Sequence, residues 1–138
     1  MINYLLVFLT AMTPIGELRA AIPIGLAKNL SIYWVYLIAI IGNLIPVIFI
    51  LLLAKRFCPK WLCCRIEKKH NHKFIKWGEL ALIPFVGLPL PLTGAWTGAL
   101  AAVVFGVRFW RALSLISIGV IIAGIIVSLA TLGFIKLL

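Results

Sequence analysis

Two stretches of the chain are long and apolar enough to cross a membrane once each. They run from Ser31 to Ala54 and from Phe109 to Ile135, and each provides the about 20 apolar residues that a crossing helix needs. Both contain residues that are typical of kinks or close helix contacts rather than of breaks. These residues are Gly42, Asn43 and Pro46 in the first stretch and Gly119, Gly124 and Gly133 in the second. The pattern predicts two membrane-spanning helices.

Two further apolar stretches are interrupted by polar, proline-rich turns. Thr13 to Arg19 interrupts the stretch from Ile2 to Ala27, and Gly87 to Gly94 interrupts the stretch from Leu80 to Gly106. Each half has about 7–12 residues, which at 1.5 Å per residue covers about half of a ~30 Å hydrocarbon core. Half-length helices joined by a polar turn form a re-entrant hairpin, which is tolerated where protein or water covers the turn. We therefore predict two re-entrant hairpins.

Each interrupted stretch could instead form one long kinked helix. Pro23 and Pro84 interrupt the two stretches a second time, and proline removes a hydrogen bond from a helix interior. A single first helix would also hold Glu17 and Arg19 near the bilayer centre, at about 2.5–3.5 kcal/mol for each charged group. These costs favour the hairpins.

Basic residues are distributed unevenly between the two faces. Re-entrant hairpins return to the side they enter, so only the two long helices change sides. The eight basic residues from Lys55 to Trp77 then share one face with Arg108 and Arg111, which gives ten against two, Lys28 and Lys136, on the other. The single-helix alternative gives nine against three. Since segments rich in Lys and Arg stay cytoplasmic, we predict a multi-pass protein of a prokaryotic inner membrane with both termini outward.

The predicted organisation is a single membrane domain over residues 1–138. A first repeat (1–54) and a second repeat (78–138), each a hairpin plus a long helix, flank a basic cytoplasmic interfacial segment (55–77). Glu17 to Gly25 can be aligned with Gly98 to Gly106, so that an Ala-Ala pair and the final glycine coincide. An all-α inverted repeat of this kind is the plan of many secondary transporters.

Composition supports a membrane protein. Residues are 64% hydrophobic and 12% charged, whereas soluble domains carry about 25% charged residues. The net charge of +10 falls mostly in the basic segment, which indicates a cytoplasmic loop rather than nucleic-acid binding. Lys55 to Lys76 alternates basic with aromatic and apolar residues, and we expect it to lie at the interface and hold anionic lipid headgroups.

Metal-ligating side chains also lie in the basic segment, but their spacing matches no standard zinc pattern. They are Cys58, Cys63, Cys64, His70 and His72. An odd number of cysteines there favours reduced thiols. The sequence holds no nucleophile triad, Walker loop or dinucleotide motif. We therefore expect no enzyme, no metal and no cofactor.

Glu17 and Arg19 are the charged residues of the first turn. Thr13-Pro14 predicts a helix that starts with Thr as the N-cap and Pro as the first residue, and Thr93-Gly94 predicts the same at the second turn. Both helix N-termini then point toward the membrane middle with a partial positive charge. Together with the Arg19 guanidinium they suit a carboxylate or a phosphate.

Each candidate residue has a structural alternative. Arg19 could pair with Glu17 or hold backbone carbonyls of the opposite turn. Glu17 could be a fixed first-turn charge instead of the proton-coupling carboxyl that transporters use. Trp96 could line the cavity or lie in the interior, and Glu79 could mark the interface or form a second proton site. Gly94 and Gly98 suit a close helix contact.

At the two turns the chain resembles the small multidrug export proteins of bacteria and archaea. The motifs are TPIGELRAAIPIG at 13–25 and PLPLTGAWTGALAA at 89–102, and the resemblance covers nearly the whole chain. It implies transport and a plan similar to the DedA/VTT superfamily, with paired re-entrant hairpins in an inverted repeat. DedA-type relatives are linked to flipping of lipid-carrier phosphates, with further acidic and arginine residues that this chain lacks. The signature positions that it implies are Glu17, Arg19, Pro23, Pro89, Pro91, Thr93, Gly94 and Trp96.

The first hypothesis is a small membrane transporter or exporter, ion- or proton-coupled, with an anionic small-molecule or lipid substrate between the hairpin tips. The second is a DedA-type flippase or scramblase of lipid or polyprenyl phosphate, and the third is a non-transporting scaffold. Two polar turns must be shielded from lipid by protein. We therefore also expect a homodimer, which packs through the helix around Gly119 and Gly124. The predicted substrate or ion site consists of Glu17, Arg19, Thr13, Thr93, Gly94 and Trp96. The predicted tips contain Pro14, Gly16, Pro23, Pro89 and Pro91.

Overall fold

Two long apolar helices form the frame of the molecule. The computed structural model describes residues 1–57, 72–88 and 94–137, and this part of the chain is helical with short turns. The long helices are α3 (Ile32–Phe57) and α7 (Phe109–Leu137), of 26 and 29 residues. Both are long and apolar enough to cross a membrane, so two helices of spanning length occur where the sequence predicts them.

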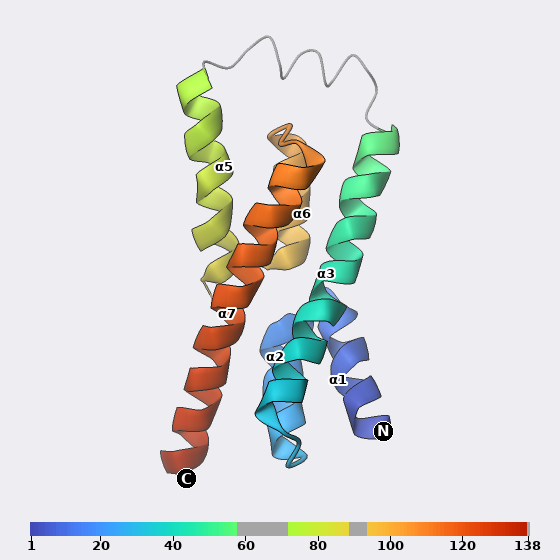
Figure 1. The fold of residues 1–138 in the computed structure, drawn as a ribbon, viewed down its shortest axis with the longest axis vertical. Helices are drawn as coiled ribbons and strands as arrows, with labels where there is room; N and C mark the ends of the chain where they lie inside the picture. The colour runs from blue at the N-terminus through green and yellow to red at the C-terminus, as the bar shows by residue number, and fades with distance from the viewer. Residues whose placement is uncertain (58–71, 89–93, 138) are drawn as a thin grey trace.

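The first interrupted stretch forms two short helices, α1 (Ile2–Met12) and α2 (Glu17–Ala27). Each has 11 residues, which corresponds to about 16 Å. They pack against each other as an antiparallel hairpin (Figure 1). The alternative of one kinked helix is therefore wrong here. Pro23 lies inside α2, so the prediction that it interrupts the helix is also wrong.

The second interrupted stretch likewise forms two helices, α5 (His72–Gly87) and α6 (Ala95–Val104). The 16 residues of α5 exceed the predicted 7–12, because the helix begins inside the segment expected to lie at the interface. Pro84 lies inside α5 rather than ending it. Residues 58–71 of the basic segment, with its cysteines and His70, lie outside the described residues.

The two halves of the chain pack in the same way. α1 and α2 lie on α3, α5 and α6 lie on α7, and α2 contacts α7 while α6 contacts α3. The hairpins come from opposite ends of the molecule, and their turns lie near its middle (Figure 1). The N- and C-termini lie at the same end, opposite the ends of α3 and α5 that the basic segment joins.

Glycines let the helices approach closely inside this one chain. A Cβ on Gly124 would lie 2.6 Å from the ring of Tyr36 on α3, and one on Gly119 would lie 2.8 Å from Val86 on α5. A Cβ on Gly98 would also overlap Val86, as expected for a small-residue contact. Gly119 and Gly124 thus pack within the chain, and a homodimer through the helix around them stays a prediction.

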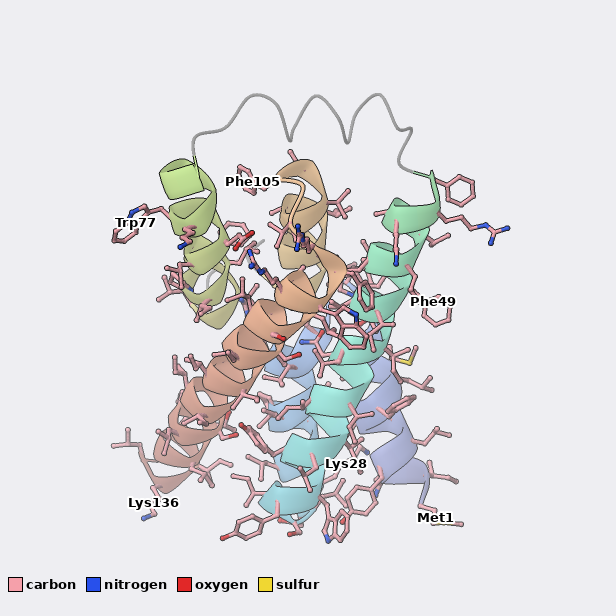
Figure 2. All side chains as sticks on the ribbon, turned by 45° about the horizontal axis from the view of Figure 1, so that its top comes forward. Met1, Lys28, Phe49, Trp77, Phe105 and Lys136 are labelled. Carbon is pink, nitrogen blue, oxygen red and sulfur yellow. The ribbon has the colours of Figure 1, made fainter. Side chains whose placement is uncertain are left out.

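Large apolar side chains cover the outside of the helices (Figure 2). A soluble monomer rarely exposes contiguous apolar patches beyond a few hundred Å², whereas lipid contact favours such a surface. Exposed aromatic side chains belong to both ends of the molecule. Tyr33 and Trp34 are at the start of α3, whereas Trp77 (Figure 2) and Trp110, at the start of α7, are near the opposite end (Figure 1). Such belts are typical of the two membrane–water interfaces.

Candidate functional site

The turn of the first hairpin is tight and strained. The Thr13 hydroxyl oxygen accepts a hydrogen bond from the Gly16 N–H at 3.0 Å, and the Glu17 N–H donates to the Thr13 carbonyl at 3.0 Å. Glu17 then adopts φ 45°, a left-handed conformation that costs a non-glycine residue about 1–2 kcal/mol. α2 begins at Glu17 with Gly16 as its N-cap. The prediction that this helix starts with Thr13 as N-cap is wrong, because Thr13 closes the turn that precedes it.

The second hairpin places Gly94 at the N-cap of α6. Gly94 is extended at φ −159°, and its N–H donates to the Thr97 hydroxyl oxygen at 2.8 Å. The predicted N-cap, Thr93, is therefore displaced by one residue. Thr93 itself lies outside the described residues, as do Pro89 and Pro91.

The Glu17 carboxyl reaches the N-terminus of α6. It is buried and accepts a hydrogen bond from the backbone N–H of Trp96, in the first turn of that helix. A Cβ on Gly94 would overlap both carboxyl oxygens, so the absence of a side chain at Gly94 permits this approach. Because a helix N-terminus carries a partial positive charge, the carboxylate of the first hairpin complements a helix end of the second.

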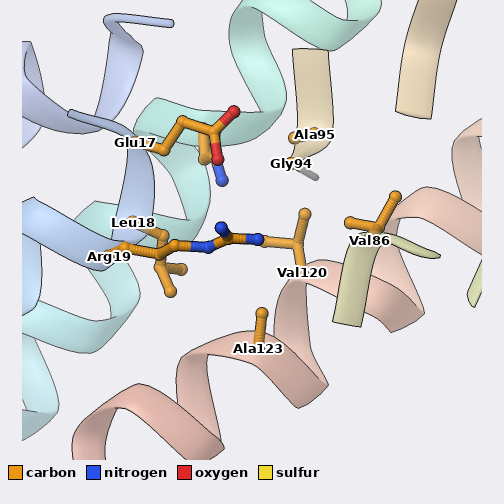
Figure 3. Close-up of a pocket in the computed structure, with 9 residues that line it drawn as sticks. Glu17, Leu18, Arg19, Val86, Gly94, Ala95, Val120 and Ala123 are labelled. Carbon is orange, nitrogen blue, oxygen red and sulfur yellow. The ribbon is translucent and has the colours of Figure 1, made fainter. Parts of the chain in front are cut away.

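Arg19 makes the complementary contact at the end of α5. Its Nη2 donates to the carbonyl of Leu88 at 2.9 Å, one residue after α5 ends at Gly87. A helix C-terminus carries a partial negative charge and favours a cation. The contact matches one of the structural alternatives for Arg19, in which the guanidinium holds a carbonyl of the opposite turn. Figure 3 shows Glu17 and Arg19 extending side by side from α2.

A small cavity lies between the two turns. Its volume is ≈ 10 Å³, which is room for about one water molecule. Helices α2, α3, α5, α6 and α7 all contribute to it, so it lies where the two halves of the chain meet. A substrate larger than about one water molecule does not fit in a cavity of this volume. The lining residues are Glu17, Leu18, Arg19, Asn43, Val86, Gly94, Ala95, Val120 and Ala123 (Figure 3).

Asn43 belongs to this site, although the sequence did not identify it as a site residue. It lies on α3 and is 3% exposed, and its Oδ1 has no hydrogen-bond partner in the part of the chain that the structure describes. The available signal was an amide inside a long apolar stretch, where polar side chains are usually functional. The sequence pattern alone predicts only a kink at this residue.

The other candidates lie around the cavity rather than in it. Trp96 contributes its backbone N–H, whereas its half-buried side chain is not among the lining residues. Pro14 is exposed in the first turn. Glu79 forms an ion pair with Arg111 at 3.6 Å, which joins α5 to the start of α7, away from the turns. Among the described residues, no group of three metal-ligating side chains occurs.

The chain is helical and apolar, has two helices of spanning length and exposes large apolar side chains on its outside. These features are typical of an integral membrane protein. Residues 17–126 match the family described as "Putative small multi-drug export protein", and the chain belongs to this family. The match begins at Glu17, where the first turn ends, and extends through the second turn. No curated protein and no solved structure gives a match. The relation to the DedA/VTT superfamily stays a prediction.

Proposed function

We propose that the protein is a small membrane transporter in which α1–α2 and α5–α6 are re-entrant hairpins that enter from opposite faces. Helices of 11 residues reach only about halfway through a ~30 Å core, and both turns lie near the middle of the molecule (Figure 1). Backbone at such depth is tolerated only where protein or water covers it. The substrate path would therefore pass between the two turns.

The packing supports an inverted repeat of α1–α2–α3 and α5–α6–α7. In each half the hairpin lies on its own long helix and its second short helix contacts the long helix of the other half. Inverted repeats with sites at half-helix ends are common in secondary transporters. Among the described residues, Lys28 and Lys136 lie at the end that holds the termini, which would face outward. At the other end lie Lys55, Arg56, Lys76, Arg108 and Arg111.

The observation that carries the proposal is the reciprocal contact of Glu17 and Arg19 with the second hairpin. The carboxylate complements the start of α6, and the guanidinium complements the end of α5. Hydrogen bonds to charged groups contribute about 1.5–3 kcal/mol each. These contacts therefore stabilise the arrangement in which the two hairpins touch, and they are weak enough to break. A proton on Glu17 removes the charge that α6 attracts, which favours separation of the hairpins. The freed helix N-terminus then suits an anionic substrate group.

Flux measurements on purified protein in liposomes test this mechanism. Vesicles with an imposed pH gradient are loaded with fluorescent organic anions, organic cations or labelled lipids in turn. We expect pH-dependent flux of an anionic solute in the wild type. Glu17→Gln keeps the shape but exchanges no proton, so its flux should not depend on pH. Glu79→Gln is the matched control, because Glu79 pairs with Arg111 away from the turns.

Other outcomes identify the alternatives. A wild-type pH profile in Glu17→Gln would remove the coupling role of Glu17. Movement of labelled lipid without solute flux would support a flippase, and no flux of any probe would support a scaffold. If Glu17→Gln and Arg19→Ala lower only the melting temperature and leave the pH profile unchanged, the two residues serve only to hold the hairpins together.

A further inference from the structure

The buried amide of Asn43 has an acceptor without a donor. Asn43 is 3% exposed on α3, and no group in the described part of the chain donates to its Oδ1. An unpaired buried acceptor costs about 1–3 kcal/mol, and the large majority of buried polar side chains have a partner. The cavity that Asn43 lines is the place from which a donor can come.

Glu17 and Arg19 are the charged side chains that line this cavity, and protonation of Glu17 changes the number of hydrogen-bond donors in it. An ionised Glu17 carboxylate only accepts hydrogen bonds, whereas the protonated carboxyl has one O–H to donate. Arg19 is the other charged residue among the lining side chains, and its guanidinium donates to Leu88. The lining residues from α5, α6 and α7 are apolar or glycine, and the sequence of α1 has no charged residue.

The contacts seen in the structure fit the ionised state of Glu17. The carboxyl accepts the Trp96 N–H, and none of the described residues donates to Asn43 Oδ1 in this arrangement. A proton from solution forms an O–H bond on Glu17, and the neutral carboxyl then attracts the N-terminus of α6 less strongly. The same proton provides the donor that Asn43 lacks.

We propose that Asn43 Oδ1 accepts a hydrogen bond from an O–H group in this cavity when Glu17 carries its proton. The O–H belongs to Glu17 itself, because a water could donate to Asn43 whether Glu17 is ionised or neutral. Asn43 thereby stabilises the neutral state of the site from α3, while Trp96 stabilises the ionised state from α6. The inference rests on the proposed function in one respect, namely that Glu17 exchanges a proton.

Infrared titration of the purified protein in nanodiscs tests this pairing without a transport substrate. The chain has only three acidic side chains, so the band that Glu17→Gln removes identifies the protonated Glu17 carboxyl. In Asn43→Leu, which has similar size but no acceptor, we expect this band to disappear about one pH unit lower than in the wild type. That shift corresponds to one buried hydrogen bond lost from the neutral state.

Three comparisons sharpen the experiment. Asn43→Ser keeps an oxygen acceptor and should shift less, and Asn3→Leu, an exposed asparagine on α1, should not shift at all. Asn43→Ala repeats the test without added bulk if the leucine variant does not fold. Titration in H₂¹⁸O tests the donor, because an isotope-sensitive O–H band that needs Asn43 would show that a water, and not the Glu17 carboxyl, donates to Asn43 and would overturn the inference.

An unchanged midpoint, or a shift to higher pH, in both Asn43→Leu and Asn43→Ala would overturn the inference. The result is distinguishable from failure of the proposed function. An Asn43-dependent titration without any flux would count against transport alone. A pH-dependent flux that needs Glu17, together with an unshifted titration in the Asn43 variants, would count against the Asn43 pairing alone.

Discussion

Gly94→Ala isolates the contact between the two hairpins without changing any charge. The backbone of Gly94 is extended at φ −159°, a conformation that alanine adopts freely. The added methyl group would overlap the Glu17 carboxyl oxygens, so the carboxyl must move away from the Trp96 N–H. The substitution therefore acts on Glu17 through space.

The expected cost follows from the contact that is lost. A hydrogen bond to a charged group contributes about 1.5–3 kcal/mol, which already includes part of the attraction to the helix end. Replacing glycine by alanine at a compatible position returns about 0.4–1 kcal/mol through the unfolded state. Gly94→Ala should thus lower the free energy of unfolding by about 1–2 kcal/mol. In a Glu17→Ala background the three atoms nearest to this methyl group are removed, so the same change should stabilise by about 0.4–1 kcal/mol.

Equilibrium unfolding in mixed detergent micelles, followed by circular dichroism, measures both changes as a double-mutant cycle. Gly78→Ala is the control, since a Cβ at Gly78 on α5 would meet no described atom within 4 Å. It should be neutral or stabilising in both backgrounds. An equal cost of Gly94→Ala with and without the Glu17 side chain would refute the proposed contact, because the effect would then come from the backbone alone.

Three further predictions concern the rest of the molecule. Arg19→Leu should lower the free energy of unfolding by about 1.5–3 kcal/mol through loss of the Leu88 contact, and Arg19→Lys should lose less; equal losses in micelle unfolding would argue against a role of the guanidinium. Gly124→Leu should destabilise the fold of each chain, because the leucine would overlap Tyr36, and it should not change association. Native mass spectrometry in nanodiscs should therefore give a homodimer for the wild type and for any folded variant. A folded Gly124→Leu protein that is only monomeric would instead indicate that the dimer packs through Gly124. Single cysteines placed at Ile2 and Leu138 should be labelled from the same side of the membrane, and one at Lys68 from the opposite side; labelling of Leu138 from the side of Lys68 would contradict the hairpin topology.

The helices could be predicted because their causes are local. Apolar length alone identifies α3 and α7, and the prolines and polar residues of the two turns identify four short helices. The exact starts could not be predicted, since the left-handed backbone of Glu17 moves the beginning of α2 three residues beyond Pro14. Pro23 and Pro84 lie inside helices because neighbouring helices can compensate for a missing hydrogen bond, which no local pattern reveals.

The site could be predicted only in part, for a different reason. Glu17 and Arg19 were identifiable as rare charges in an apolar stretch. Their partners lie far away along the chain, as the 69 residues between Arg19 and Leu88 illustrate. Residue spacing carries no information on such a contact until the fold is known. Asn43 was missed for the same reason, because only the packing of α3 against both hairpins makes it a neighbour of Glu17.

The short length of α1 and α2 has an electrical consequence. In the proposed membrane arrangement, Glu17 lies where the turns of the two hairpins meet near the middle, so a proton that reaches it from either face crosses about half of the transmembrane voltage. One elementary charge that crosses the full voltage gains or loses about 2.3 kcal/mol per 100 mV, hence about 1.2 kcal/mol over half of it. Occupancy of Glu17 from one face would then change about sevenfold per 100 mV. Membrane potential alone would bias the proton on Glu17, even with equal pH on both sides.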